Sequence, residues 1–263
     1  MKVLTYNICF EQVTGQIKLS KRNNSMQCVG EKFPNRCFLN VIENLRVKDI
    51  DYDFICLQES SYYKHIHNEI NKTMFLKNRQ KNYYAMISTQ SGHEDMVTYF
   101  NNSKYTLLAY FKSEVKKGRP VLTTIFKEGV IVINVHFSHR GDKIDFLSWL
   151  KRLNLFLSKN THLISCFQNF RILMMGDFNN ELKDKINLQF TVKQKNIKFV
   201  RKLHQHPNAK EIKTCCVDKK RKRNVFCIDQ IFDSNDSPLL TSVLTTNHNP
   251  SSDHYPVCSL LIN

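Results

Sequence analysis

Apolar, strand-like runs that end in a polar side chain recur along this chain, and they constrain its fold more than any other feature. Five such runs cover residues 2–5, 53–57, 129–133, 170–175 and 224–228, and they lead to Asn7, Glu59, His136, Asp177 and Asp229. Burying a carboxylate, an amide or an imidazole costs free energy unless the group has a partner. We therefore predict that these strand ends meet and build one polar site on a rigid floor.

The distribution of the polar ends indicates a single domain. They run from Asn7 to a Ser-Asp-His sequence that ends at His254, so both ends of the chain must belong to one fold if they share a site. A chain of 263 residues can form one large α/β domain, residues 1–263, with a sizeable core. Many strand-like runs alternate with few helical stretches, which predicts a layered α/β fold with mixed sheets.

The apolar periodicity also predicts individual elements. Further strands are expected at residues 83–88, 96–100, 104–111 and 119–127, and helices at residues 38–45, 62–71 and 142–157. The last helix is expected to carry one apolar stripe formed by Ile144, Leu147, Leu150, Leu153 and Leu157. Two polar and basic stretches, residues 12–36 and 180–224, are interpreted as loops that decide specificity.

The chain carries a formal net charge of +16, with 39 Lys and Arg residues against 23 Asp and Glu residues. Such a surplus attracts polyanions such as nucleic acids, although abundant Lys, Asn and Ile are also typical of proteins from AT-rich genomes. The densest basic run consists of Lys219, Lys220, Arg221, Lys222 and Arg223. A clamp for a phosphate backbone, a solvated loop and a nuclear-localisation patch all remain open for this run.

The cysteines and the apolar content bear on location. Nine cysteines occur without a Cys-x-x-Cys spacing, which argues against zinc and favours a reducing compartment without disulfides. No stretch approaches the roughly 20 apolar residues of a membrane span, and the first residues do not resemble a signal peptide. We expect a soluble intracellular protein, cytoplasmic or nuclear, that is a monomer with no obligate protein partner.

The polar strand ends carry chemistry that suits phosphodiester cleavage. Glu59 is an acceptor-only carboxylate and therefore a suitable ligand for magnesium. Asp177 and Asn179 are two residues apart, so they face the same side of an extended chain. There Asp177 can orient or deprotonate the attacking water, while Asn179 donates to a phosphate oxygen. The alternative for this Gly-Asp-Phe-Asn sequence is a simple turn.

Asn134 and His136 repeat the spacing of two residues on another strand. His136 can contact the phosphate or assist the leaving group, and Glu94 is a candidate partner for its ring. A single histidine at a strand end is more often structural. The weight of the argument therefore lies in the conjunction of these residues.

Asp253 and His254 form a second pair near the end of the chain. In a loop their side chains can diverge, so that Asp253 faces the metal and His254 faces the phosphate or the water. Asp229 can then accept a hydrogen bond from His254 and fix the tautomer of its ring.

Six motifs follow one another in a familiar order: Thr5-Tyr6-Asn7, Leu57-Gln58-Glu59, Asn134-Val135-His136, Gly176-Asp177-Phe178-Asn179, Ile228-Asp229-Gln230 and Ser252-Asp253-His254. This series resembles that of the endonuclease/exonuclease/phosphatase superfamily, the DNase I-like fold, and it covers essentially the whole chain. The resemblance implies a four-layer α/β sandwich of two packed mixed β-sheets flanked by helices. It also implies a phosphodiesterase or nuclease that depends on Mg²⁺, with Mn²⁺ as the alternative ion.

By position, the resemblance implies a metal site of Asn7, Glu59 and Asp253, catalytic roles for His136, Asp177, Asn179, Asp229 and His254, and a substrate contact from Asn134. The motifs look most like those of tyrosyl-DNA phosphodiesterases, which are enzymes of DNA repair. The expected substrate is therefore nucleic acid or a nucleic-acid adduct. A phosphoesterase for small molecules or lipids and a non-catalytic nucleic-acid-binding module are the alternatives.

Overall fold

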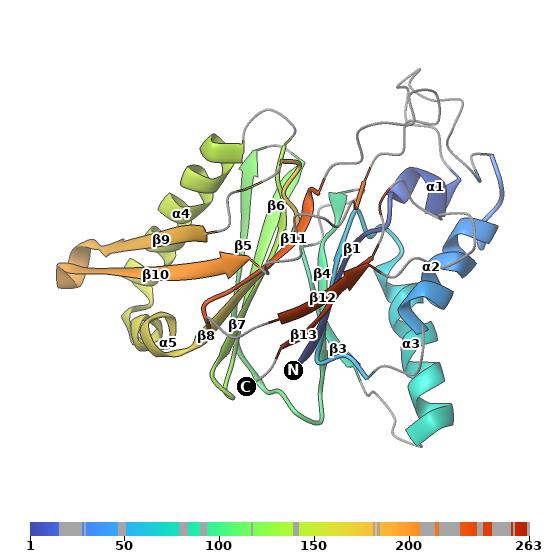
Figure 1. Ribbon diagram of the computed structural model, residues 1–263, viewed down its shortest axis with the longest axis horizontal. Coiled ribbons are helices and arrows are strands. Elements are labelled where there is room, and N and C mark those ends of the chain that lie inside the picture. The colour runs from blue at the N-terminus through green and yellow to red at the C-terminus, as the bar shows by residue number, and fades with distance from the viewer. Residues whose placement is uncertain are drawn as a thin grey trace.

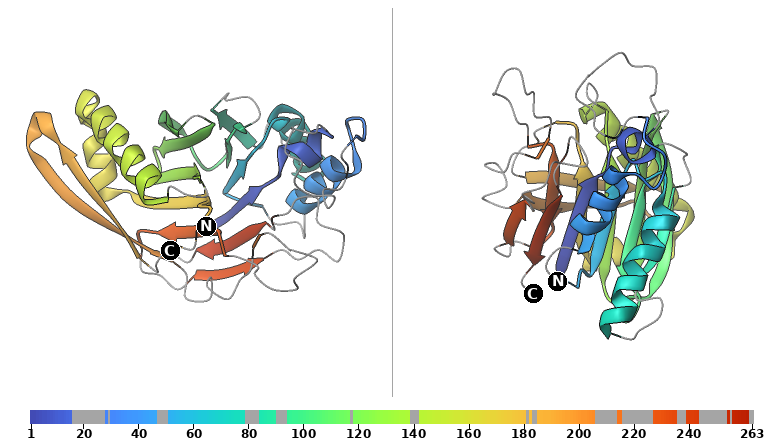
Figure 2. Two further views of the ribbon diagram at one scale, coloured as in Figure 1. Left: turned by 90° about the horizontal axis from the view of Figure 1, so that it is seen from above. Right: turned by 90° about the vertical axis from the view of Figure 1, so that its right-hand side faces the viewer.

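Two β-sheets pack face to face, and helices cover the outer side of each sheet (Figures 1 and 2). This architecture is that of a computed structural model. It describes residues 1–15, 28, 30–46, 51–78, 84–89, 94–116, 118–138, 142–180, 182, 185–205, 214–215, 227–235, 239–243, 254 and 256–261. The predicted four-layer α/β sandwich is confirmed.

The first sheet has six strands in the order β12-β13-β1-β2-β4-β3. They are β1 (Lys2–Asn7), β2 (Phe54–Gln58), β3 (Tyr84–Ser88), β4 (Val97–Asn101), β12 (Leu239–Val243) and β13 (Val257–Leu261). β1 and β2 are parallel with Asn7 opposite Gln58, so their carboxyl ends lie together. β1 is antiparallel to β13, and the amino group of Met1 donates to the Leu261 carbonyl oxygen at 2.8 Å.

The second sheet has seven strands in the order β5-β6-β7-β8-β11-β10-β9. They are β5 (Leu107–Lys116), β6 (Arg119–Phe126), β7 (Val130–His136), β8 (Arg171–Asp177), β9 (Lys185–Val192), β10 (Ile197–Gln205) and β11 (Asp229–Asp233). β7 and β8 are parallel with His136 opposite Asp177. β11 runs antiparallel on the other side of β8 and places Asp229 opposite Asp177. The register therefore aligns three predicted site residues across neighbouring strands.

Three apolar clusters hold these layers together. Between the sheets, Phe54 and Phe100 of the first sheet pack with Phe126 and Leu173 of the second. The outer side of the first sheet is covered by α1 (Phe10–Thr14), α2 (Arg36–Arg46) and α3 (Tyr63–Asn78). The outer side of the second is covered by α4 (Asp142–Lys159), the short helix η3 (Thr161–Leu163) and α5 (Ile164–Asn169). Burial of these apolar faces is the main term that stabilises the sandwich.

Two expectations about the elements were wrong. The stretch from residue 180 to 224, interpreted as a loop, contains the β9–β10 hairpin and its short connecting helix η4 (Lys193–Lys195). In α4, Leu150, Leu153 and Leu157 are buried as predicted, but Ile144 and Leu147 are exposed. The inner face of the first turns is supplied by aromatic side chains, with Trp149 buried and Phe146 packed against the core.

The expectation that the chain lacks disulfides was also wrong. Cys28 and Cys37 are joined, with their Cα atoms 6.1 Å apart, because the start of α2 lies beside the segment that precedes it. Cys9, Cys56 and Cys258 are buried and do not take part in a disulfide. None of the described helices is both long enough and apolar enough to cross a membrane.

Candidate active site

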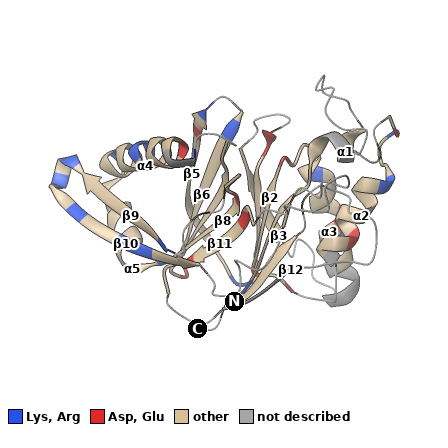
Figure 3. Cartoon of the chain, turned by 45° about the horizontal axis from the view of Figure 1, so that its top comes forward, with Lys and Arg blue, Asp and Glu red and all other residues tan. Residues whose placement is uncertain are grey.

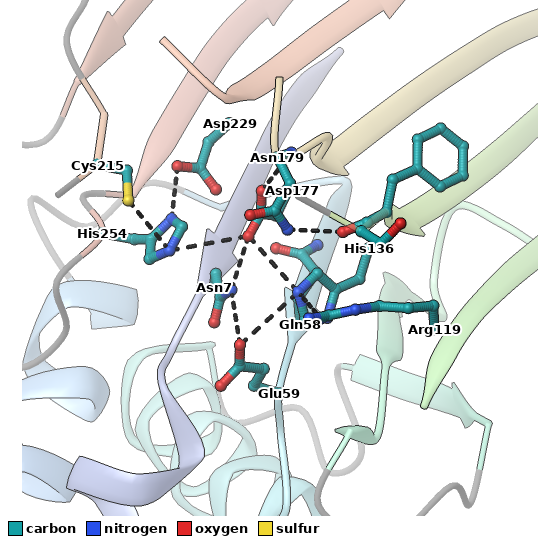
Figure 4. Close-up of polar contacts among 12 residues, drawn as sticks. Asn7, Gln58, Glu59, Arg119, His136, Asp177, Asn179, Cys215, Asp229 and His254 are labelled. Atoms are coloured by element: carbon teal, nitrogen blue, oxygen red, sulfur yellow. Dashed lines mark hydrogen bonds and ion pairs between the residues drawn. The ribbon is translucent and has the colours of Figure 1, made fainter. Parts of the chain in front are cut away.

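The carboxyl ends of β1 and β2 in the first sheet meet those of β7 and β8 in the second, and polar side chains fill the junction (Figure 4). Asn7 lies at the centre of this junction. Its amide nitrogen donates to Glu59 Oε1 at 3.2 Å and to Asp177 Oδ2 at 2.9 Å, while its Oδ1 accepts from the backbone nitrogen of Cys9 at 3.1 Å. One amide therefore connects carboxylates that belong to different sheets and lie far apart in the sequence.

Local backbone geometry directs two of these side chains. Glu59 and Asn179 have φ values of 53° and 52°, in the left-handed region that few side chains adopt. Each residue comes directly after a strand or one residue beyond it, so the chain turns sharply where the site begins. Strained conformations of this kind cluster at functional sites, where the surrounding structure enforces them.

Gly176 lies within β8, next to the end of the strand, and its backbone is constrained for a different reason. It has a φ of 144°, and a Cβ atom there would lie 2.1 Å from the Val135 carbonyl oxygen. β7 and β8 thus approach each other too closely for any side chain at this position. The atoms that exclude a side chain here belong to the backbone of β7.

His136 lies among carboxylates. Its Nδ1 is 3.3 Å from Glu94 Oε2, which confirms the expected partner, and its Nε2 is 3.7 Å from Glu59 Oε1 and 3.6 Å from Asp177 Oδ2. The guanidinium of Arg119 contacts the His136 ring and Glu94. Arg119 was not predicted, because it begins β6 without any motif around it. It adds a positive charge to a site otherwise rich in acids.

His254 is held on the opposite side of Asp177. Its Nδ1 is 2.8 Å from Asp229 Oδ2, as expected, and its Nε2 lies 3.8 Å from Asp177 Oδ2 and 3.3 Å from Cys215 Sγ. The Thr214 hydroxyl accepts a hydrogen bond from the Asp229 backbone nitrogen at 3.0 Å. Thr214 and Cys215 were not predicted, because the sequence around them carries no catalytic pattern.

Burial changes the acid strength of two carboxyl groups in the site. Loss of solvation raises the pKa of Asp229 to about 6, against the opposing effect of the neighbouring His254. Burial likewise raises the pKa of Glu59, and the nearby His136 opposes the rise. Perturbed acids that share a cleft with imidazoles are typical of catalytic sites.

Besides Asn7, the two other predicted asparagines occupy different environments. Asn179 donates from Nδ2 to the Phe137 carbonyl oxygen at 2.6 Å, and its buried Oδ1 has no hydrogen-bond partner within the described parts of the chain. Asn134 is fully buried, accepts from Gln58 Nε2 at 2.7 Å, and donates to the carbonyl oxygens of Leu57 and Val97. Because both sides of its amide are engaged, Asn134 connects the two sheets beneath the site.

No model of a known protein family matches the sequence. Among curated proteins, the uncharacterized protein L684 of Acanthamoeba polyphaga mimivirus is 28% identical in an alignment of 194 residues that covers 69% of this chain and 35% of that protein. The chain thus spans about a third of the length of this relative.

Solved structures match the whole chain. TDP2 from Caenorhabditis elegans aligns with a TM-score of 0.59 at 13% identity, covering 98% of this chain and 73% of that one. ANGEL2, a 2',3'-cyclic phosphatase, aligns with a TM-score of 0.58 at 18% identity, covering 98% of this chain and 93% of that one. An endonuclease/exonuclease/phosphatase family protein from Bacteroides thetaiotaomicron aligns with a TM-score of 0.59 at 15% identity, covering 98% of this chain and 96% of that one. The chain has the endonuclease/exonuclease/phosphatase fold.

In this fold the polar junction offers two sets of side chains with metal-ligand chemistry. Glu59, Glu94 and His136 form one set, and Asp177, Asp229 and His254 form the other; within each set the candidate ligand atoms lie within 4.8 Å of one another. Clustered carboxylate oxygens are the donors that Mg²⁺ and Mn²⁺ prefer, so the residues present fit a hard divalent cation. Asp253, expected to join the metal site, and the basic run at residues 219–223 lie outside the described residues.

Proposed function

We propose that this chain is a divalent-metal-dependent phosphodiesterase that hydrolyses phosphoester bonds in nucleic acid or in a nucleic-acid adduct. The observation that supports this most is the convergence of Glu59, Asp177 and His254, which are distant in sequence, on one junction bridged by the Asn7 amide. The fold shared with TDP2 and with ANGEL2 supports the reaction class. The net charge of +16 supports an anionic polymer as the substrate.

The proposed metal ligands are Asn7 and Glu59, with Asp253 as a third. A bound Mg²⁺ would neutralise the phosphate and polarise its P–O bonds. The Glu59 side chain is only 20% exposed and already within hydrogen-bond distance of Asn7. The two ligands are therefore held in position by the ends of β1 and β2, not by a mobile loop.

Asp177 is proposed to orient the attacking water and to accept its proton. Its Oδ1 accepts from the backbone nitrogen of Asn179 at 2.7 Å, which fixes the carboxylate, while Oδ2 faces Asn7 and both imidazoles. One oxygen thus anchors the group and the other faces the reacting region. The Asn179 amide, which lies next to this carboxylate, is proposed to help hold the phosphate.

His254 and His136 are proposed to contact the phosphate from opposite sides. Asp229 accepts from Nδ1 of His254, so Nε2 is the ring atom directed towards Asp177 and the substrate. His136 shares its side with the Arg119 guanidinium, whose positive charge can offset the developing charge of the leaving oxygen.

A substrate panel tests the proposal. Purified protein would be incubated with a plain oligonucleotide, a 5'-tyrosyl oligonucleotide, an oligonucleotide ending in a 2',3'-cyclic phosphate, bis-p-nitrophenyl phosphate and sphingomyelin, each with Mg²⁺, Mn²⁺ or EDTA. We expect turnover of at least one oligonucleotide that EDTA abolishes. Turnover of sphingomyelin alone would favour the lipid phosphoesterase, and tight oligonucleotide binding without any turnover would favour the non-catalytic module.

A further inference from the structure

Helix α4 carries exposed apolar side chains on the face that turns away from the sheet. Ile144, Leu147 and Leu155 are 73%, 53% and 58% exposed. They recur at helical spacing, and Lys151 lies between the two leucines on the same face. Large apolar side chains that are exposed together mark an interaction site more often than chance does.

Leu147 and Leu155 border a cavity of about 700 Å³ between α4 and the end of the β9–β10 hairpin. Both elements project from the same side of the molecule (Figure 2). The cavity is lined by apolar and by basic residues, among them Leu147, Leu150, Lys151, Arg152, Leu155 and Lys193. This volume lies within the range of about 300–1,000 Å³ that is typical of ligand pockets in proteins.

The charged side chains that line this cavity, which we call the groove, are all basic. Neither residues 146–176, which contain most of α4, nor residues 185–205, which contain the hairpin, include a single Asp or Glu. Lys151, Arg152 and Lys193 are exposed at the groove itself, and further basic residues follow along the hairpin (Figure 3). The groove therefore combines an apolar floor with a positively charged rim.

We propose that this groove docks an acidic amphipathic helix of a partner protein. Leu147 and Leu155 are eight residues apart, which is about 12 Å along α4 and matches two turns of a second helix. Apolar side chains of the partner at positions i, i+4 and i+7 would enter the groove, and flanking Glu or Asp residues would meet the basic rim. None of the lining residues belongs to the candidate active site, so docking leaves that site open.

Two other partners fit the groove less well. A phosphate backbone would use the lysines, but exposed leucines offer a nucleic acid neither hydrogen bonds nor aromatic stacking. A membrane surface is flat, whereas the leucines border a hollow that the hairpin partly encloses. A rod-shaped amphipathic segment satisfies both the shape and the charge.

Trp149, the sole tryptophan, provides a local reporter because it is buried in α4 between Ser148 and Leu150, which line the groove. A panel of 16-residue helical peptides with leucine at i, i+4 and i+7 and flanking glutamates would be titrated against the full chain, following Trp149 fluorescence and peptide anisotropy. We expect saturable binding by members of the panel. Matched peptides with lysine in place of glutamate should bind at least tenfold more weakly.

Two double variants locate the contact. Leu147→Ser with Leu155→Ser, and Lys151→Glu with Lys193→Glu, should each weaken peptide binding at least tenfold without changing the melting temperature appreciably. Leu39→Ser is the control, because Leu39 is 57% exposed on the distant α2. It should leave binding unchanged.

The proposal is overturned if no peptide of the panel binds or if the groove variants bind as well as the parent chain. It is equally overturned if phosphatidylserine vesicles or a duplex oligonucleotide bind in a manner that the leucine variant abolishes while the peptides do not. Phosphodiesterase activity should be unchanged in both groove variants, so these results are independent of the proposed catalytic function.

Discussion

Asp177 makes the most contacts with other candidate catalytic groups, and its substitution is the sharpest test at the scale of single residues. Asp177→Asn keeps the shape of the side chain but removes the negative charge and the ability to accept a proton. We expect turnover of the best oligonucleotide substrate to fall by about 10²–10⁴-fold. Steady-state kinetics would measure the loss, and circular dichroism would check that the fold is retained.

Glu43→Gln is the matched control, because Glu43 is an exposed carboxylate on α2, on the outer side of the first sheet. It should keep full activity. Undiminished turnover in Asp177→Asn would show that the water is activated by another group.

The pairing of Asp229 with His254 predicts how activity depends on pH. The pKa of Asp229 is raised to about 6 by burial, so the carboxylate that orients His254 becomes protonated as the pH falls below that value. We expect activity to decrease as the pH falls through about 6. The observed value belongs to the coupled pair and not to Asp229 alone.

The amide side chain in Asp229→Asn does not titrate, so this variant should lose the acidic limb of the pH profile. It should also be less active at neutral pH. A profile of kcat/KM against pH for both proteins makes the comparison. An unchanged acidic limb in Asp229→Asn would mean that the limb arises from another group.

Single residues were predictable from the sequence where a short motif surrounds them. Asn7, Glu59 and Asp177 each follow an apolar run, so a polar residue there stands out. Arg119 and Thr214 also enter the site, but they do so through the packing of β6 and of a segment far along the chain. No local pattern distinguishes these two residues from ordinary surface side chains.

At the scale of elements, a substitution at Gly176 tests whether the parallel pairing of β7 and β8 requires a residue without a side chain. Gly176→Ala would place a Cβ atom against the Val135 carbonyl oxygen, so the strands must separate. We expect a loss of about 3 kcal/mol or more in the free energy of unfolding, measured by urea denaturation.

Gly129→Ala separates backbone strain from steric overlap. Gly129 also has a positive φ, of 81°, but no atom lies within 4 Å of the position a Cβ would take. This variant should lose only about 1–2 kcal/mol. Equal losses in the two variants would show that the close approach to Val135 is not the cause.

The hydrogen bond between Gln58 and Asn134 tests the junction of the two sheets. Gln58→Met or Asn134→Leu alone leaves a buried polar group without its partner, which costs about 1–3 kcal/mol. The double variant should be more stable than the sum of the two losses predicts, with a coupling energy of about 0.5–3 kcal/mol. Chemical denaturation of the four proteins of the cycle measures this coupling, and strict additivity would contradict a direct contact.

Elements were predictable where their periodicity was free of interruption. The helix of α4 follows from its leucine spacing, whereas the β9–β10 hairpin was read as a loop because of its many lysines. Its signal was nevertheless present, since Ile186, Leu188, Phe190 and Val192 alternate with polar residues. Lys185 of β9 and Lys198 and Lys202 of β10 lie on the exposed faces of their strands, where basic side chains are compatible with a strand.

At the scale of the whole molecule, metal binding should stabilise the folded state, because the proposed ligands Asn7 and Glu59 come together only when β1 and β2 are paired. A ligand that binds only the folded state at a hundredfold excess over its Kd adds about 2.7 kcal/mol. We expect Mg²⁺ or Mn²⁺ to raise the Tm by several degrees, and EDTA to reverse the rise. Differential scanning calorimetry measures the shift.

Glu59→Gln should abolish most of this metal-dependent rise, because it removes the charge of a proposed ligand. Glu43→Gln should retain the rise. An equal rise in Glu59→Gln would place the metal elsewhere in the molecule.

The architecture was predictable because the motifs occur in a characteristic order along the chain. The order of the motifs does not predict which side chains contact one another in the folded molecule. The bond from Asn7 to Asp177 spans 170 residues of sequence and depends on how two separately assembled sheets pack. Such contacts follow from the apolar layer between the sheets, which a pattern of single residues does not specify.

The arrangement of the strands has a consequence for biosynthesis. β5 to β11 form the second sheet from one continuous stretch, whereas the first sheet combines β1 to β4 with β12 and β13. A nascent chain emerging from the ribosome can complete the second sheet while β1 still lacks its neighbour β13. His254 lies shortly before β13, so the contacts of its ring with Asp177 and Asp229 can form only after the strands of the second sheet have been synthesised.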